Sequence, residues 1–292
     1  MLTLKTLLGD HPHMTALKSG QIQSPRLVLD FAEVKIAFPE FKRVVRDLEF
    51  DVAELALVTY LQAKVHGIPL VLVPAVMFAM HAPHALIVHN PERSGLLGPR
   101  DIPGRRVGIR ASSVTTVMWV CGILQNDYGV DLERVNWVTF EDPHVAEFKD
   151  PPNAQRAPAG KKLLTMLIDG ELDAAVVRRD DLADPRIRSL IPDAEAAARA
   201  WSETHRMQPI NHMLVVKQSL AKSEPWAVPE IFRMLTESRR LAGTPAGVLP
   251  LGVEANRKSL EMAIGYAVQQ HLIPKRFEVD ELFDDLSRVL GS

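Results

Sequence analysis

Cysteine and aromatic residues are scarce in this chain of 292 residues, which has one cysteine, Cys121, and only 6% aromatic residues. A single cysteine excludes an intrachain disulfide and a cysteine-rich zinc site. Its place in the apolar stretch 114–124 predicts a buried, inert thiol. An excess of either charge is also missing, because 34 basic residues stand against 36 acidic ones. We therefore expect no nucleic-acid partner and no general binding to membrane surfaces.

A secretory signal is not evident in the first residues, MLTLKTLLGDHPH, which have one short apolar run and no small-residue cleavage site. This absence predicts a cytoplasmic protein. Sequence motifs for nucleotide binding, serine hydrolysis and zincin chemistry are missing too: there is no G-x-x-x-x-G-K-[ST], no G-x-G-x-x-G after a strand, no G-x-S-x-G and no H-E-x-x-H.

Charged residues are absent from residues 65–91, a stretch long enough to span a bilayer. Three prolines inside it would break a spanning helix, and its apolar pieces have the length of strands. We therefore predict two buried strands, 70–73 and 85–88, joined by a loop that carries histidines. No membrane segment is expected.

Strands alternate with helices along the chain, which predicts an α/β fold with mostly parallel sheets. The length suggests two domains or lobes at about 150 residues each, enough to fold without a disulfide or metal. We expect a helix over 51–66 that begins at Asp51, and a second helix that ends at Gly129. Ligands of such sheets bind where strands end and helices begin, so we singled out the loops 9–15, 77–84, 111–116 and 209–212.

Histidines lie in three of these loops. His11 and His13 follow the first expected strand, His84 follows the first of the two apolar strands, and His212 begins a later one. At strand ends they can serve as general acid and base near neutral pH. Two alternatives remain open: His11 and His13 as metal ligands, or all of these histidines as ordinary loop or core residues. The metal alternative lacks further histidines at the ends of the expected strands 135–140 and 172–177.

Hydroxyl side chains gather where a strand leads into a helix, and a basic residue precedes them: Arg110, Ser112, Ser113, Thr115 and Thr116. Free backbone N–H groups and hydroxyls at a helix start can hold a carboxylate or phosphate. Ordinary N-capping by Ser112 or Ser113 would need no ligand. Glu54 is expected in the first turn of the 51–66 helix, either as a surface residue or as a carboxylate that orients a histidine or binds a substrate hydroxyl.

Taken in order, several segments resemble the 4,5-dihydroxyphthalate decarboxylase-like family. The resemblance covers nearly the whole chain, and the YGVD…W and PINH elements are its more specific parts. The segments are Gly9-Asp10, FDVAELALVTY (50–60), DIPGRRVGI (101–109), the helix with Trp119 and GIL (122–124), YGVDLERVNW (128–137), DGELDAAV (169–176), PINH (209–212) and LPLGVEANRKSLE (249–261).

This resemblance implies a two-lobed, type 2 periplasmic-binding-protein-like α/β fold with a ligand cleft between the lobes. Lobe one would be residues 1–93 plus 207–292, and lobe two residues 94–206. The resemblance places one set of residues around the cleft and adds Asp10 and Asn211 to the substrate-binding candidates. The catalytic candidates are His11, His13, His84 and His212, and the other binding candidates are Glu54, Arg110, Ser112, Ser113, Thr115 and Thr116.

The sequence departs from the family pattern after the first apolar strand. The resemblance implies arginines there, beside a phenylalanine and a histidine, but residues 77–84 read MFAMHAPH. If those arginines hold substrate carboxylates, this chain takes a less charged substrate than a phthalate dianion, or performs a different reaction.

The leading hypothesis is a decarboxylase of a hydroxylated aromatic acid, a lyase of aromatic degradation that needs no cofactor and no metal. Its partner would be a small carboxylate, and an oligomer is compatible with the sequence. A solute-binding protein without catalysis, of the kind that serves ABC transporters, is the alternative, because one fold can serve both uses. A metal-dependent hydrolase or decarboxylase built on His11 and His13 is the third reading.

Overall fold

A computed structural model describes residues 1–245 and 247–291 and divides the chain into two compact units. The first unit contains Met1–Ala79, Gln208–Gly265 and Ile273–Ser292, and the second contains Met80–Met207 and Tyr266–Leu272. The sequence predicts the first crossing near residue 93. In the structure residues 80–93 belong to the second unit, because β5 (Ile87–His89) pairs there with β9 (Ala174–Val176) and β10 (Arg188–Ser189).

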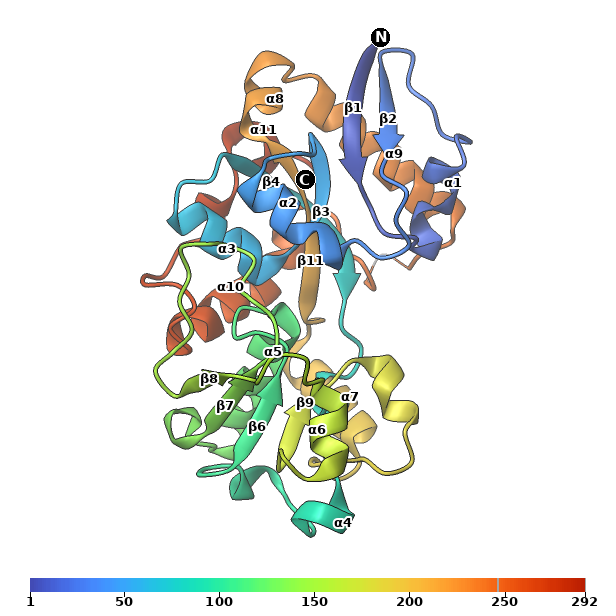
Figure 1. Ribbon diagram of the computed structural model, residues 1–292. Coiled ribbons are helices and arrows are strands. Elements are labelled where there is room, and N and C mark those ends of the chain that lie inside the picture. Colours follow the sequence, from blue (N-terminus) through green and yellow to red (C-terminus); the bar gives the residue numbers. More distant parts are fainter. Residues whose placement is uncertain (246, 292) are drawn as a thin grey trace. The chain divides into compact units, whose positions relative to one another are not determined.

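The first unit is built on a five-stranded sheet in the order β2-β1-β3-β11-β4 (Figure 1). The strands are β1 (Leu2–Leu7), β2 (Leu27–Phe31), β3 (Val52–Ala56), β4 (Leu70–Ala79) and β11 (Ile210–Lys217). β1 is parallel to β2 and β3, whereas β11 is antiparallel to both β3 and β4. Four of the five strands thus run in the same direction, and β11 is the antiparallel exception to the expected parallel sheet. As a result, the carboxyl ends of β1, β3 and β4 lie at the same edge as the amino end of β11.

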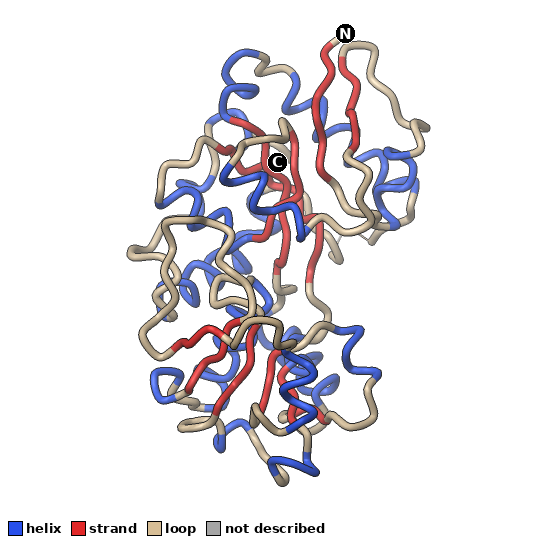
Figure 2. The backbone as a smooth tube through the Cα atoms, in the orientation of Figure 1, coloured by secondary structure: helices blue, strands red, loops and turns tan. Residues whose placement is uncertain are grey.

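The second unit has a six-stranded sheet in the order β10-β5-β9-β6-β7-β8, and the two groups of strands are drawn red in Figure 2. Its remaining strands are β6 (Arg106–Ile109), β7 (Asn136–Thr139) and β8 (Ala154–Arg156). β9, β6, β7 and β8 run parallel, and β5 is antiparallel to both of its neighbours, β9 and β10. The predicted βα series of this unit is confirmed, because α5 follows β6 and ends at Gly129 in a left-handed conformation.

Helices and single turns connect these strands. The α-helices are α1 (Thr15–Lys18), α2 (Phe41–Arg46), α3 (Leu57–Val65), α4 (Pro91–Ser94), α5 (Thr115–Tyr128), α6 (Leu163–Asp169), α7 (Ala194–His205), α8 (Gln218–Ser223), α9 (Ala227–Leu241), α10 (Val253–Gln269) and α11 (Asp285–Arg288). The 3-10 turns are η1 (Pro12–Met14), η2 (Phe38–Glu40), η3 (Pro83–Leu86), η4 (Pro99–Asp101), η5 (Leu132–Arg134), η6 (Arg179–Ala183) and η7 (Val279–Leu282). Among the described residues, no helix has the length and apolarity needed to cross a bilayer.

Two sequence predictions for the first unit need correction. The predicted helix over 51–66 is split, because residues 52–56 form β3 and only α3 is helical. Asp51 does not cap a helix: its carboxylate accepts hydrogen bonds from the Lys5 backbone N–H and from the Lys217 ammonium, each at 2.9 Å. Pairing of residues 52–56 with strands on both sides outweighs their local helical tendency.

The apolar stretch 65–91 supplies β4, η3 and β5, which confirms its interpretation as buried strands rather than a membrane helix. β4 carries an irregularity: Val73 pairs with Leu214, Val76 with Met213 and Phe78 with His212, so three residues, Pro74, Ala75 and Met77, are extra on the β4 side. Proline has no N–H to donate to a ladder and favours such positions. The irregularity brings Phe78 opposite His212.

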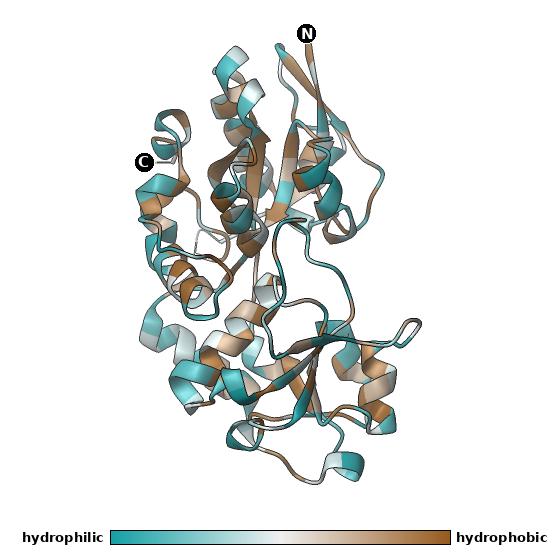
Figure 3. Cartoon of the chain, turned by 60° about the vertical axis from the view of Figure 1, so that its left-hand side comes forward, coloured by the Kyte–Doolittle hydropathy of each residue, from teal (hydrophilic) through white to brown (hydrophobic). Residues whose placement is uncertain are grey.

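Apolar side chains fill the space between each sheet and its helices. In Figure 3 the strands are largely brown, and the helices carry both colours. α9 shows the reason: its buried residues Val228, Ile231, Leu235, Ser238 and Arg239 recur at helical spacing and form one face. That face includes two polar residues, which lie among the apolar core of the first unit.

Candidate functional site

The carboxylate of Glu54 holds two histidines together in the first unit. Its Oε2 lies 2.7 Å from Nε2 of His11, and its Oε1 lies 2.6 Å from Nδ1 of His212. The backbone N–H of Gly9 also donates to Oε2, at 3.1 Å. Glu54 is only 1% exposed, so all three hydrogen bonds form away from bulk water. One buried carboxylate thus fixes the orientation of two imidazole rings.

The sheet explains how these groups meet. Ala56 of β3 pairs with His212 of β11, and Glu54 pairs with Leu214. Side chains two residues apart on a strand share a face, so Glu54 and His212 are diagonal neighbours on one face of the sheet. His11 reaches the same carboxylate from the loop after β1, the strand that pairs with β3.

Both histidines keep one ring nitrogen for other partners. Because an ionised carboxylate only accepts hydrogen bonds, Nε2 of His11 and Nδ1 of His212 carry the protons that point to Glu54. Nδ1 of His11 and Nε2 of His212 then make no hydrogen bond to any residue that the structure describes. The side chains are 23% and 14% exposed, respectively, so these nitrogens can meet a small molecule.

The charge state of Glu54 follows from its partners. Burial alone would raise the pKa of the carboxyl, but the hydrogen bonds from His11 and His212 outweigh it and hold the pKa well below its ordinary value of 4.5. Glu54 is therefore an anion at neutral pH. It stabilises a proton on either imidazole, as the carboxylate of a catalytic triad does for its histidine.

Aromatic rings surround the pair. Phe78, 42% exposed, lies nearly parallel to His11 with ring centres 6.3 Å apart, and it lies 5.6 Å from His212. Phe41 of α2 meets His212 edge to face at 5.1 Å. The His13 ring is also stacked on His11, at 5.1 Å. Each of the two histidines thus contacts at least two other rings.

His13 differs from His11 and His212 because no carboxylate or other polar side chain of the described residues hydrogen-bonds its ring. It is 7% exposed, and its Nε2 has no hydrogen-bond partner among the described residues. Burial, together with the nearby charges of His11 and Arg239, lowers the pKa of His13 to about 3. His13 is therefore a neutral ring at physiological pH, which suits it to packing against His11 rather than to proton transfer.

The hydroxyl cluster lies in the second unit, at the start of α5. The residue that precedes α5 is Val114, so neither Ser112 nor Ser113 caps the helix with its side chain. Both serines are buried, with 7% and 1% exposure, and neither hydroxyl oxygen has a partner within the described part of the chain. Thr115 and Thr116 are the first two residues of α5. The unpaired hydroxyls of Ser112 and Ser113, next to the start of a helix, make this a suitable place for an anion.

A small cavity of about 100 Å³ adjoins this helix in the same unit. Ser112, Cys121, Gln125 and Trp137 are among the residues that line it. Burial raises the pKa of the Cys121 thiol to about 12, which confirms the prediction of a buried, inert cysteine.

His84 and Arg110 also belong to the second unit. His84, in η3, is 2% exposed and packs against Trp201 with ring centres 6.1 Å apart, and burial lowers its pKa to about 4. Arg110 lies at the end of β6, where its Nε is 3.3 Å from a carboxylate oxygen of Glu141. Burial lowers the pKa of Arg110.

The remaining predicted residues take less central positions in the first unit. Asp10 is bound by the ammonium of Lys18, and its side chain is 53% exposed. Asn211 is buried in β11 beside His212. No sequence motif indicated a role for Phe78 or Phe41, although Phe78 lies near the end of an apolar strand, just before a histidine-bearing loop. It also placed Glu54 in a helix, which the structure corrects to a strand.

A metal centre finds no support in the side-chain arrangement. Among the residues that the structure describes, no three His, Cys, Asp or Glu side chains are grouped so that they could hold a metal ion. His11 and His212 each direct one nitrogen at Glu54 rather than at a shared point.

Sequence comparison identifies related proteins. No protein-family model matches the chain. A 4,5-dihydroxyphthalate decarboxylase from Comamonas testosteroni is 29% identical over 257 residues, which cover 83% of this chain and 76% of the relative. A protein of the same name from Pseudomonas putida is 27% identical over 214 residues, covering 68% of this chain and 81% of the relative. The resemblance inferred from the sequence segments is thereby confirmed.

Structural comparison shows the fold. The alkanesulfonate-binding protein SsuA from Xanthomonas axonopodis pv. citri, bound to MOPS, has a TM-score of 0.65 at 15% identity and covers 97% of this chain and 98% of its own. The desulfurization enzyme DSZB has a TM-score of 0.57 at 14% identity over 98% of both chains. The chain therefore has the predicted two-lobed α/β fold of periplasmic binding proteins, which occurs in both a binding protein and an enzyme.

Proposed function

We propose that the protein is a decarboxylase of a hydroxylated aromatic acid, and that His11 and His212 carry out its proton transfers. The observation that carries the proposal is Glu54, a buried carboxylate that hydrogen-bonds both imidazoles at 2.6–2.7 Å. A solute-binding site has no need for two titratable rings held by one buried anion. Loss of CO2 from an arene needs a base and an acid together, and such proton transfers contribute about 10²–10⁴-fold to a rate.

In the proposed reaction, one imidazole removes the proton of a ring hydroxyl, which makes the ring electron-rich. The other imidazole, protonated and paired with Glu54, delivers its proton to the ring carbon that bears the carboxylate. The bond between that carbon and the carboxylate then breaks, its electron pair restores the aromatic ring, and CO2 leaves. The first imidazole returns its proton to the ring oxygen, and the second regains a proton from water. One carboxylate and one proton thus become one CO2 and one C–H bond.

The relatives support the reaction class, and the sequence narrows the substrate. Both are named for decarboxylation of 4,5-dihydroxyphthalate, which carries two carboxylates. The loop 77–84 of this chain contains no arginine. We therefore propose an acid with fewer negative charges than a phthalate. Unpaired Ser112 and Ser113 at the uncapped start of α5 are our candidates for contact with an anionic group.

The decisive test is release of CO2 from a panel of hydroxylated aromatic mono- and dicarboxylates, with ring products identified by mass. We expect turnover of at least one monocarboxylate. Replacement of His212 or His11 by Gln should lower kcat by about 10²-fold or more, whereas His66→Gln, at an exposed position in the same unit, should not. Unchanged turnover of a folded His212→Gln variant would remove His212 from the mechanism.

The second candidate function is binding of a small organic anion without catalysis. It is favoured by the likeness to SsuA, a binding protein, and by the unpaired hydroxyls at α5. If every panel member comes back intact while some raise the melting temperature, this reading replaces the decarboxylase.

A further inference from the structure

Arg239 is a buried cation without an anionic partner in the first unit. It is 4% exposed, and no carboxylate of the described residues pairs with it. Its guanidinium instead donates to two backbone carbonyls, that of Leu249 at 3.0 Å and that of Val76, while its Nε has no partner within the described chain. Burial lowers the pKa of Arg239 to about 10, which leaves the group charged. Burying a cation is costly, so its retention calls for a reason beyond packing.

The two carbonyls belong to segments that meet at the irregular part of β4. There the loop after α9 replaces part of β11 as the partner of β4: Ala75 forms a bridge with Leu251, and the N–H of Gly252 donates to the carbonyl of Pro74 at 2.8 Å. Arg239 spans this junction with the planar fork of its guanidinium, a geometry that lysine and methionine cannot reproduce.

The junction determines where Phe78 lies. Side chains alternate along a strand, so a change in the number of extra residues before Phe78 would turn its ring away from His212. With Pro74, Ala75 and Met77 extra on the β4 side, Phe78 pairs with His212 and contacts both histidine rings. Arg239 therefore acts on the histidine pair through β4 and Phe78.

The preceding residue, Ser238, hydrogen-bonds the backbone segment that carries His13, next to His11 of the histidine pair. It is fully buried, its hydroxyl donates to the carbonyl of His13 at 2.8 Å, and its oxygen accepts from the N–H of Leu17 at 3.2 Å. This fixes the η1 segment, whose His13 ring is stacked on His11. Consecutive residues of a helix point about 100° apart. Ser238 and Arg239 of α9, which is orange and lies beside α1 in Figure 1, can therefore hydrogen-bond η1 and β4 at the same time.

We infer that Ser238 and Arg239 are positioning residues that set the ring geometry of His11 and His212 from α9. Neither touches the two histidines directly. Each holds one of the two backbone segments that flank them. The inference rests on the proposed function only for its activity readout, because the ring geometry can be measured without substrate.

The test compares Arg239→Met and Arg239→Lys with the control Arg240→Met. Arg240 is the next residue, its side chain is 67% exposed, and it pairs with Glu237. The first readout is the ¹⁵N and ring-proton NMR shifts of His11 and His212 in the substrate-free protein. The second is kcat and KM on the best panel substrate. We expect Arg239→Met to shift both sets of resonances and to lower kcat about 10- to 100-fold, with a smaller change in KM.

Arg239→Lys, which keeps the charge but lacks the fork, should recover part of the lost rate, and Arg240→Met should match the parent protein. Ser238→Ala gives a second probe, expected to move the His11 resonances more than those of His212. A folded Arg239→Met variant with unchanged resonances and unchanged kcat would overturn the inference. If that variant does not fold, unchanged resonances in both Ser238→Ala and Arg239→Lys would overturn it. If Arg239→Met shifts the histidine resonances but the parent protein releases no CO2 from any substrate, the proposed function is contradicted and this inference is supported.

Discussion

The two units of the chain differ in how their polar groups are satisfied. In the first unit, Glu54, His11 and His212 are joined by short hydrogen bonds around one buried carboxylate. In the second unit, the hydroxyls of Ser112 and Ser113 are buried and have no partner among the described residues. The first arrangement fixes protons and ring orientations in advance. The second leaves donors whose hydrogen-bonding capacity a ligand can satisfy.

This contrast separates two roles that a site needs. Groups that move protons benefit from fixed partners, because orientation then costs nothing at the moment of reaction. Groups that bind a ligand must remain without an internal partner, and a buried polar group without one destabilises the folded protein by about 1–3 kcal/mol. The arrangement in the first unit is thus suited to proton transfer and that in the second to ligand contact, and the predictions below test that division.

The largest effect is expected from Glu54→Gln. An amide offers one acceptor oxygen to two imidazole N–H groups and carries no charge to stabilise a protonated ring, so kcat should fall about 10³-fold. Steady-state kinetics on the best substrate measures this. Glu49→Gln is the matched control, since Glu49 is a more exposed glutamate of the same unit that binds Arg43 and Lys5. Retention of more than a tenth of the parental kcat in Glu54→Gln would contradict the role given to the carboxylate.

Acid should weaken both units through buried histidines. Burial lowers the pKa of His13 to about 3 and that of His84 to about 4, against 6.5 for an ordinary histidine. As pH falls below 6.5, these imidazoles bind protons in the unfolded chain but stay neutral in the folded chain. The free energy of unfolding therefore falls. Each histidine should remove about 2 kcal/mol between pH 6.5 and pH 5. The lowered pKa of Glu54 acts only below its ordinary value of 4.5, outside this window.

Urea unfolding at both pH values tests this expectation. His84→Leu should remove the contribution of His84, and His13→Leu that of His13, while His89 of the second unit, whose pKa burial also lowers, keeps its own. Leu190→Ala, a buried position that does not titrate, should lower stability equally at the two pH values. A variant of either histidine that retains the full parental loss would show that its imidazole is not neutral in the folded protein.

A smaller effect is expected when the unpaired hydroxyls are removed. Ser112→Ala and Ser113→Ala should each weaken binding of the carboxylate ligand about tenfold, a loss of about 1.4 kcal/mol, and should leave stability unchanged or slightly raised, because a buried hydroxyl without a partner is removed. Ser189→Ala is the opposite case, since the Ser189 hydroxyl donates to the carbonyl of His84 and accepts from the N–H of Ile191. It should lower stability by about 1 kcal/mol and spare affinity. Calorimetric binding and thermal unfolding separate the two patterns. If all three serine variants showed the same changes in affinity and stability, the proposed difference between the two units would be contradicted.

The sequence predicted the α/β class, most of the strands and the residues of both clusters. The sequence also marked the end of α5 at Gly129. It failed where partners distant in the chain decide the outcome. The β3 segment was taken for the start of a helix because its ladder partners in β1 and β11 lie far away in sequence.

The same limit applies to the site. Histidines after strands indicated His11 and His212, but their sharing of Glu54 depends on the register of β3 against β11. Phe78 was missed because its place opposite His212 depends on the three extra residues of β4. Arg239 gave no signal at all, since a charged residue near the end of an amphipathic helix is usually exposed.

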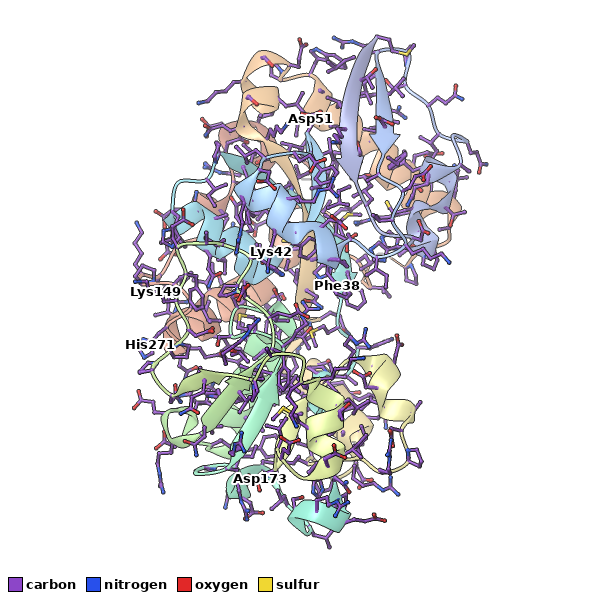
Figure 4. The ribbon with its side chains drawn as sticks, viewed as in Figure 1. Phe38, Lys42, Asp51, Lys149, Asp173 and His271 are labelled. Atoms are coloured by element: carbon purple, nitrogen blue, oxygen red, sulfur yellow. The ribbon has the colours of Figure 1, made fainter. Side chains whose placement is uncertain are left out.

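The smallest effect is expected where the two units are alike. Asp51 and Asp173, both labelled in Figure 4, lie next to the amino ends of β3 and β9 and bind the backbone N–H of a residue at a neighbouring strand, Lys5 and Arg106 respectively, each at 2.9 Å. Their side chains are 29% and 28% exposed, so solvent screens part of each interaction. Asp51→Asn and Asp173→Asn should each lower the free energy of unfolding by about 1 kcal/mol, with kcat and KM unchanged.

Equal losses would show that the two sheets are fixed in the same way at these ends, so that the difference between the units is confined to their candidate site residues. A fall in kcat for Asp51→Asn alone would mean instead that strand β3 transmits its position to Glu54, three residues further on. The contrast between the units would then extend through the whole of the first sheet.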